Sequence, residues 1–188
     1  MNQSYEKQSI ENNPMEASYD RPMGVTLLAI LLVFGGLATL VTQMIAFNNL
    51  NETASLIGVS GYFFQGAMVF LGLLGVTAGV GTWLGKKWGW WLALFYFAYA
   101  VIRNINVIIS ITSMLELYAG AYDVLIPAYL KYGVRIIWNG ALLVYLCGET
   151  VTTFFKNEAV KKWKALLIVF GICVFIYIIG TVFNGLVV

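Results

Sequence analysis

Five long apolar segments constrain the fold of this chain more than any other feature of its sequence. A helix that crosses the ~30 Å hydrocarbon core of a bilayer needs roughly 20 apolar residues. Segments of that length run over residues 23–47, 62–85, 88–112, 127–147 and 164–185. Only 11% of the 188 residues are charged, whereas a soluble domain has about 25%. The sequence therefore predicts an all-α, polytopic membrane protein with five transmembrane helices in a bundle.

The fourth segment differs from the others because two cations, Lys131 and Arg135, interrupt it. Whether it crosses the membrane completely is therefore left open. Pro127 suits the first turn of this helix, where its missing N–H costs little.

The first 22 residues are polar and mainly acidic, and they contain no apolar run. We expect a disordered cytoplasmic tail over 1–22 and the helical bundle over 23–188. The first apolar segment, at ~25 residues, is longer than the core of a signal peptide. We interpret it as an uncleaved first span.

The lysines and arginines outside the apolar segments predict the orientation. They lie before segment one, between segments two and three, and between segment four and the first residue of segment five, at Lys7, Arg21, Lys86, Lys87, Lys156, Lys161, Lys162 and Lys164. The connections 48–61 and 113–126 and the residues after segment five contain none. Cytoplasmic loops are enriched in lysine and arginine. We therefore expect a multi-pass protein of the cytoplasmic membrane with its N-terminus inside and its C-terminus outside.

Tryptophans gather at the expected cytoplasmic interface, and indole rings prefer the headgroup level of a bilayer. The residues concerned are Trp83, Trp88, Trp90 and Trp91 around the lysine turn and Trp163 beside Lys164. We interpret them as an interfacial belt.

Glycines indicate where the predicted helices pack, because transmembrane helices associate through close backbone approach at small residues. In segment two, one helical face carries Gly72, Gly75 and Gly79, and roughly the opposite face carries Gly81 and Gly85. This helix is expected to be central, with neighbours on two sides. The neighbours belong either to the same monomer or, through the same faces, to a dimer.

Three cations lie inside the apolar segments, and these segments contain no acidic residue. The cations are Arg103, Lys131 and Arg135. At 100° per residue, one stripe of segment three carries Tyr96, Tyr99, Arg103, Asn106 and Ser110. A second stripe, in segment four, carries Lys131, Arg135 and Asn139 at i, i+4 spacing. Counted from the outer helix ends, Arg103 and Arg135 lie roughly 14 and 12 Å deep. Facing stripes would form a cationic pocket in the outer half of the membrane.

Three interpretations of these cations stay open. Each side chain can extend outward to water, to lipid phosphate or to the carboxylates of Glu116 and Asp123. Alternatively, the arginines bind a specific anionic partner, either a lipid headgroup or a carboxylate of another subunit. The third interpretation is a pathway for a small anion or polar solute.

Missing residue types exclude several classes of function. The chain has no histidine, and all nine acidic residues lie outside the apolar segments, which argues against histidine-ligated cofactors and metals, against histidine-based catalysis and against carboxylate proton relays. Cys147 and Cys173 have no imidazole or acidic helper and form no disulfide framework. The net charge of +2 does not indicate nucleic-acid binding. We expect no cofactor and no enzymatic activity.

Two stretches, RPMGVTLLAI at 21–30 followed by Gly35-Gly36 and GVGTWLGKKWGWWLAL at 79–94, resemble a family of uncharacterised multi-span membrane proteins of archaea and bacteria. The resemblance covers roughly residues 21–110. It implies a prokaryotic source and a polytopic membrane fold, and it transfers no functional residue. The fifth segment and the acidic tail depart from the family pattern.

The leading hypothesis is a non-enzymatic protein that acts by association. It would be an accessory or structural subunit of a larger membrane complex or a lipid-binding scaffold, with membrane lipids and other membrane subunits or further copies of itself as partners. The alternative is a small transporter or channel for an anion or polar solute that uses the same cationic stripe.

Overall fold

The structure is a computed structural model that describes residues 21–45, 61–117 and 122–187. Within these residues, every element is a helix and no strand occurs: α2 Met23–Ile45, α4 Gly61–Trp83, α5 Lys87–Leu117, α6 Tyr122–Leu146, α7 Glu149–Phe154 and α8 Lys162–Val187. The all-α prediction is thus confirmed. Residues 1–20 of the predicted tail and most of the connection 48–61 lie outside the described residues.

The five long helices coincide with the five apolar segments. By length and composition, two described stretches are apolar enough to cross a bilayer, Met23–Ile45 and Lys87–Thr112, and a shorter apolar stretch covers Met68–Trp83. That all five helices span a membrane stays a prediction.

Helix boundaries near the predicted outer connection 113–126 differ from the expectation. Helix α5 continues to Leu117 and α6 already begins at Tyr122, so most of this connection is helical. Pro127 consequently lies inside α6 and not in its first turn. A proline there removes the donor for the carbonyl four residues earlier, and the helix continues across this single gap.

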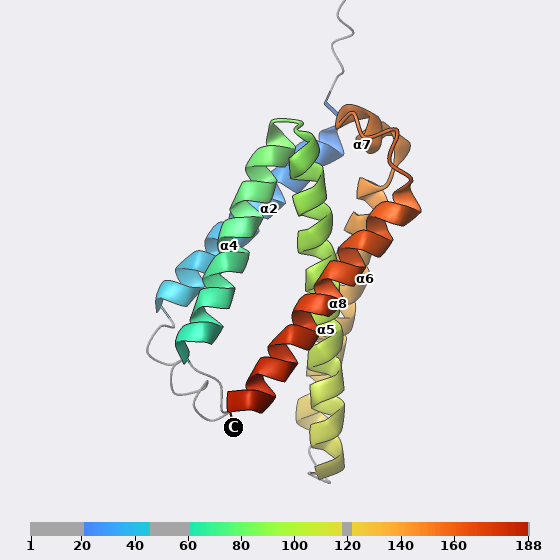
Figure 1. Cartoon of the computed structure of the whole chain (residues 1–188). Helices are drawn as coiled ribbons and strands as arrows, with labels where there is room; N and C mark the ends of the chain where they lie inside the picture. Colours follow the sequence, from blue (N-terminus) through green and yellow to red (C-terminus); the bar gives the residue numbers. More distant parts are fainter. Residues whose placement is uncertain (1–20, 46–60, 118–121, 188) are drawn as a thin grey trace, which may run out of the picture.

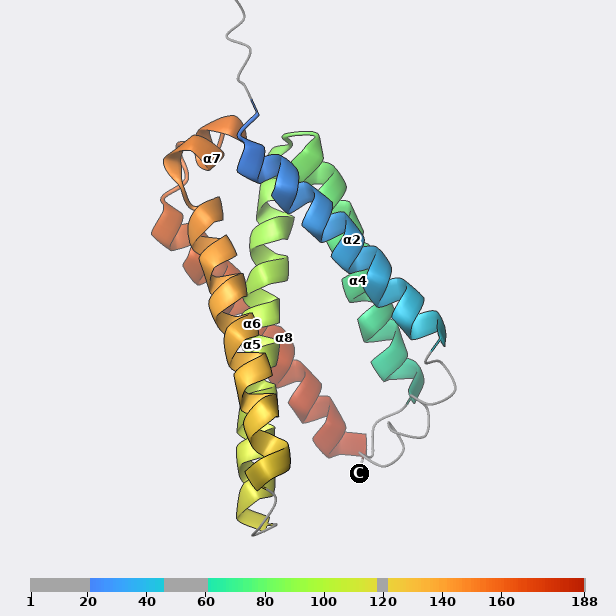
Figure 2. The ribbon, with the colours of Figure 1, turned by 180° about the vertical axis from the view of Figure 1, so that it is seen from behind.

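Helix α5 is the centre of the arrangement. It packs against α4, α6 and α8, while α2 packs on α4 and α7 contacts α6. The start of α2, the turn between α4 and α5, and α7 gather at one end of the molecule, and α8 ends at the other (Figure 1, Figure 2). The cation-bearing connections therefore share one end, as the predicted orientation requires.

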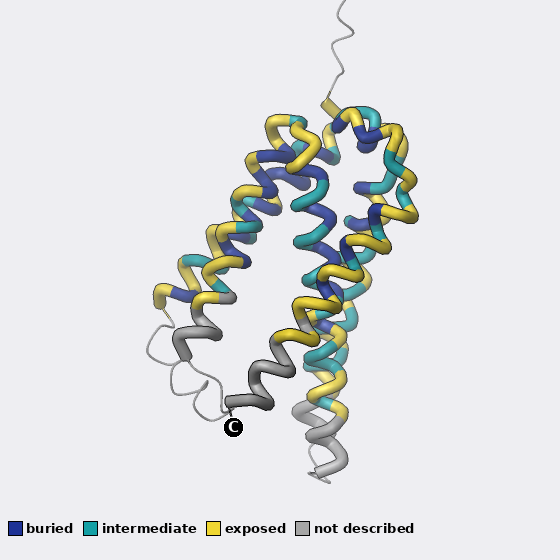
Figure 3. The backbone as a smooth tube through the Cα atoms, viewed as in Figure 1, coloured by how far each residue is buried: buried dark blue, intermediate teal, exposed yellow. Residues whose placement is uncertain are grey.

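The buried core lies mainly toward that same end (Figure 3). It includes Trp90, Leu94, Leu146, Phe155 and Cys173. The short helix α7, which the sequence analysis did not predict, contributes the buried Val151. The end of the bundle is thus closed by a helix that lies within the expected cytoplasmic connection.

Trp90 departs from the predicted interfacial belt. Its side chain is fully buried, and its indole Nε1 donates a hydrogen bond of 2.9 Å to the Leu146 carbonyl. Trp83, Trp88 and Trp163 are exposed, whereas Trp91 is half-buried. Trp90 is therefore a core residue, because its side chain points into the core cluster and reaches the end of α6.

The glycines of α4 contact two neighbouring helices. A Cβ atom at Gly79 would lie 2.6 Å from Val33 Cγ2, and one at Gly72 would lie 2.7 Å from Leu40 Cδ2, both in α2. Gly75 approaches the Gly36 backbone of α2. On the other side, a Cβ at Gly81 would collide with the Trp88 ring of α5.

Gly85 does not belong to that second face. It lies in the turn after α4 with φ of 63°, in the left-handed region that favours glycine. Its role is to end the helix and turn the chain toward α5, beside the ring of Phe154.

Candidate contact sites for an anionic partner

Arg103 lies on the exposed side of α5 and lines two pockets. The smaller one, of about 40 Å³, lies between three helices and is lined by Thr39, Leu71, Tyr96, Tyr99, Ala100 and Arg103. The larger, of about 160 Å³, is an open groove along α5 that also includes Asn106 and Ser110. Tyr96, Tyr99 and Arg103 thus face residues of α2 and α4. Asn106 and Ser110 line a groove formed by α5 residues alone.

Lys131 and Arg135 form a separate cluster around a tyrosine of their own helix. The Lys131 Nζ lies 6.0 Å and the Arg135 Cζ 5.7 Å from the centre of the Tyr132 ring. Both cations are exposed. Asn139 donates a hydrogen bond of 2.6 Å from Nδ2 to the Arg135 carbonyl, so its side-chain amide binds a backbone carbonyl of its own helix.

Within the described residues, the two stripes share neither of the pockets that Arg103 lines. Neither pocket that Arg103 lines includes a residue of α6. Counted along the helices, Arg103 and Arg135 still lie at similar depth, about 20 Å from the α5–α6 connection. Helix α6 buries the face that carries Leu143 and leaves Arg135 exposed. The two residues lie about 80° apart around the helix axis.

The polar contact between α5 and α6 involves residues that the sequence analysis did not select. The hydroxyl groups of Thr112 and Tyr129 lie 2.9 Å apart and share a hydrogen bond.

Within α5, Asn104 lies beside Arg103 and is buried. It donates a hydrogen bond of 2.6 Å from Nδ2 to the Ala100 carbonyl. These are short-range or pairwise bonds between polar groups, which give no distinctive pattern in a single sequence.

Arg21 has a structural role that sequence analysis missed. Its Nη2 donates a hydrogen bond of 2.7 Å to the Trp83 carbonyl at the end of α4, and its Cζ lies 4.8 Å from the centre of the Trp83 ring. The two stretches that carry the family resemblance therefore contact each other. Because Arg21 and Trp83 are 62 residues apart in the sequence, no local sequence pattern indicated that they contact each other.

Among the described residues, no group of three or more histidine, cysteine, aspartate or glutamate side chains is placed to hold a metal ion. The buried polar atoms without a hydrogen-bond partner in this part of the chain are Gln43 Oε1, Thr82 Oγ1 and Asn157 Nδ2. They come from separate elements and define no common site.

No protein-family description, curated protein or solved structure matches the chain. The resemblance to prokaryotic multi-span membrane proteins therefore stays a prediction, and the functional argument depends on the geometry of the described residues.

Proposed function

We propose that this chain is a non-enzymatic, multi-pass protein of the cytoplasmic membrane that works by association, as an accessory or structural subunit of a larger membrane complex or as a lipid-binding scaffold. The observation that carries the proposal is the large exposed apolar surface of the long helices. Monomeric soluble proteins rarely expose contiguous apolar patches larger than a few hundred Å². A lipid or protein environment must cover this surface.

Helix α8 is the clearest example. It packs against the core through one side, where Ala165, Val169 and Cys173 are buried and Leu166 and Phe170 are partly buried. The remaining faces expose large apolar side chains, namely Leu167, Ile168, Ile172, Val174, Phe175, Ile176, Ile178 and Ile179. A helix that is apolar all round is stable only when it is surrounded by lipid or by other helices.

Helix α6 adds charge to such a surface. Lys131 and Arg135 lie among exposed apolar residues, including Leu130, Val134 and Trp138. In the described part of the chain, no carboxylate lies within ion-pair distance of either cation. Because charges inside a membrane pair with a counter-charge or reach water, this flank fits a partner that is apolar and carries an anionic group.

The orientation with the N-terminus inside and the C-terminus outside belongs to the same proposal. Its support is the gathering of the cation-bearing connections at one end of the bundle (Figure 1). The Arg21–Trp83 contact joins two of these segments directly.

Native mass spectrometry of the protein, extracted gently from its own membrane, tests the proposal. Co-recovery of other polypeptides in fixed ratio, or of anionic lipid in stoichiometric amount, supports association. Recovery of the chain alone, without polypeptide or lipid, contradicts it. That result would favour the alternative from the sequence, a small transporter or channel for an anion or polar solute, which a liposome flux assay then examines.

A further inference from the structure

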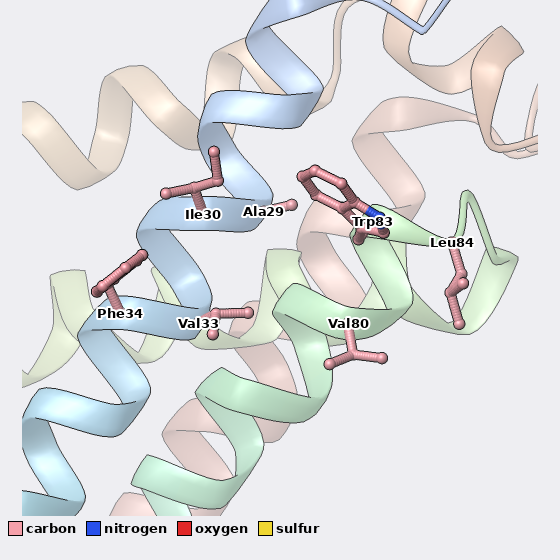
Figure 4. A pocket seen from close by; sticks show the side chains of 7 residues that line it. All are labelled: Ala29, Ile30, Val33, Phe34, Val80, Trp83 and Leu84. Carbon is pink, nitrogen blue, oxygen red and sulfur yellow. The ribbon is translucent and has the colours of Figure 1, made fainter.

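An apolar groove runs along the outer side of the α2–α4 helix pair. Its volume is about 310 Å³, and no charged residue lines it. Helix α2 contributes Ile30, Val33 and Phe34, and α4 contributes Val80 and Trp83 (Figure 4). Its walls are therefore aliphatic and aromatic, which suits the binding of a hydrocarbon chain.

The groove is preformed by close helix packing. The backbones of α2 and α4 approach so closely that a Cβ at Gly36 would lie 2.6 Å from the Val76 nitrogen. A Cβ at Gly79 would meet the Ala29 carbonyl at 2.9 Å. Such contacts hold the two walls at a fixed separation, so a ligand does not have to order them when it binds.

A cation lies at one end of the groove. The Trp83 ring, which lines the groove, also lies beneath the Arg21 guanidinium, 4.8 Å from ring centre to Cζ. Arg21 is exposed and uses Nη2 for the Trp83 carbonyl. A guanidinium has five N–H donors, so further donors are available to an external anion.

Two more cations follow within the same turn. Lys86 and Lys87 are exposed, directly after the end of α4. The groove thus has an apolar length along the helices and, next to its Trp83 end, Arg21, with the two lysines in the following turn. This arrangement matches a phospholipid, whose hydrocarbon chain would lie along the helices and whose phosphate would lie at the charged end. Arginine binds phosphate with paired hydrogen bonds, and juxtamembrane cations attract anionic lipids.

We propose that the α2–α4 groove binds one acyl chain of an anionic glycerophospholipid whose phosphate contacts the Arg21 guanidinium. This site is separate from the Arg103 and Lys131–Arg135 surfaces. The proposed lipid site depends on the proposed function in one respect: the chain must reside in a membrane. Arg21 then has two roles, since it closes the end of α4 and selects the headgroup of the lipid.

The test uses the full chain in nanodiscs of equal phosphatidylglycerol and phosphatidylcholine, with retained lipid identified by native mass spectrometry. We expect the wild type to retain phosphatidylglycerol preferentially. Arg21→Gln should reduce that preference about fivefold, because a cation near the surface attracts anionic lipid with about that factor. Val80→Trp should fill the groove and lower the retention of both lipids.

Two controls separate the lipid site from general effects. Val174→Trp changes a valine of α8 that is similarly exposed and does not line the groove, and it should leave retention unchanged. Lys161→Gln with Lys164→Gln removes two exposed cations elsewhere and should preserve the preference for phosphatidylglycerol. Circular dichroism checks that each variant remains helical.

The outcomes distinguish this inference from the proposed function. Wild-type protein that inserts into nanodiscs without preferring phosphatidylglycerol overturns the lipid site alone. An unchanged preference in Arg21→Gln, or equal losses in Val80→Trp and Val174→Trp, also overturns it. Failure of the wild type to insert into lipid at all contradicts the proposed function as well.

Discussion

Trp90 and Leu146 join the beginning of α5 to the end of α6 through a fully buried hydrogen bond of 2.9 Å from the indole Nε1 to the Leu146 carbonyl. Leu146 is the last residue of α6, and the final carbonyls of a helix have no partner within the helix. The indole therefore satisfies a carbonyl that would otherwise be buried without a donor. This bond lies at the end of the bundle where most of the buried core is found (Figure 3).

Replacing Trp90 by phenylalanine should destabilise the protein. The change removes the donor, leaves the Leu146 carbonyl unsatisfied and opens a small cavity, for an expected loss of about 1–3 kcal/mol in the free energy of unfolding. Thermal or denaturant unfolding in detergent measures this. Trp163→Phe is the matched control, because Trp163 is 71% exposed and its loss should cost less than about 0.5 kcal/mol. Equal effects in the two variants would contradict the structural role of Trp90.

Gly79→Ala should weaken the packing of α2 on α4. The added methyl would lie 2.6 Å from Val33 Cγ2 and 2.8 Å from the Val33 nitrogen, and we expect a cost of about 1–3 kcal/mol from overpacking. Gly66→Ala, in the same helix, meets nothing within 4 Å. It should stabilise the helix by up to about 1 kcal/mol, so the two unfolding curves should shift in opposite directions.

The cations inside the helices should act independently. In the described part of the chain, neither pocket that Arg103 lines includes Arg135. The effects of Arg103→Gln and of Lys131→Gln with Arg135→Gln on partner retention should therefore add in free energy. The double change on α6 should lower the affinity for the co-purified partner roughly thirtyfold, since each cation contributes about 1 kcal/mol.

Native mass spectrometry with quantified recovery measures these changes. Lys161→Gln with Lys164→Gln removes the same charge at exposed positions and should leave recovery intact. If this control loses as much partner as the α6 variant, the interaction depends on total charge and not on the α6 surface.

Cysteine labelling should reveal the orientation. In a Cys147→Ser, Cys173→Ser background, Lys87→Cys lies at an exposed position at the start of α5 and should react with an impermeant maleimide from the cytoplasmic side only. Asn51→Cys, in the predicted outer connection outside the described residues, should react from the other side. The reverse pattern would invert the proposed topology, because cytoplasmic connections are expected to carry the cations.

Helix content and approximate helix positions could be predicted from the sequence alone. Segment length and apolarity are local properties, so the five long helices lie where the apolar segments predicted them. The continuation of α5 to Leu117 and the start of α6 at Tyr122 were missed, because polar and charged residues near a helix end do not reveal where the helix stops.

The arrangement of side chains around each helix was decided by tertiary packing. The sequence placed Arg103 and Arg135 at similar depth, but the rotation of α6 about its axis, set by the burial of Leu143 and Leu146, separates their surfaces. Trp90 shares the local composition of its tryptophan neighbours, yet packing makes it a core residue.

Local sequence thus determined the class of fold, the sites of the helices and the uneven distribution of charge. Tertiary structure alone decided that Arg21 reaches Trp83 across 62 residues and that Trp83 also lines an apolar groove between α2 and α4. The physical reason is that helix formation depends on neighbouring residues, whereas the rotation and pairing of helices depend on how side chains distant in sequence fill the space between them.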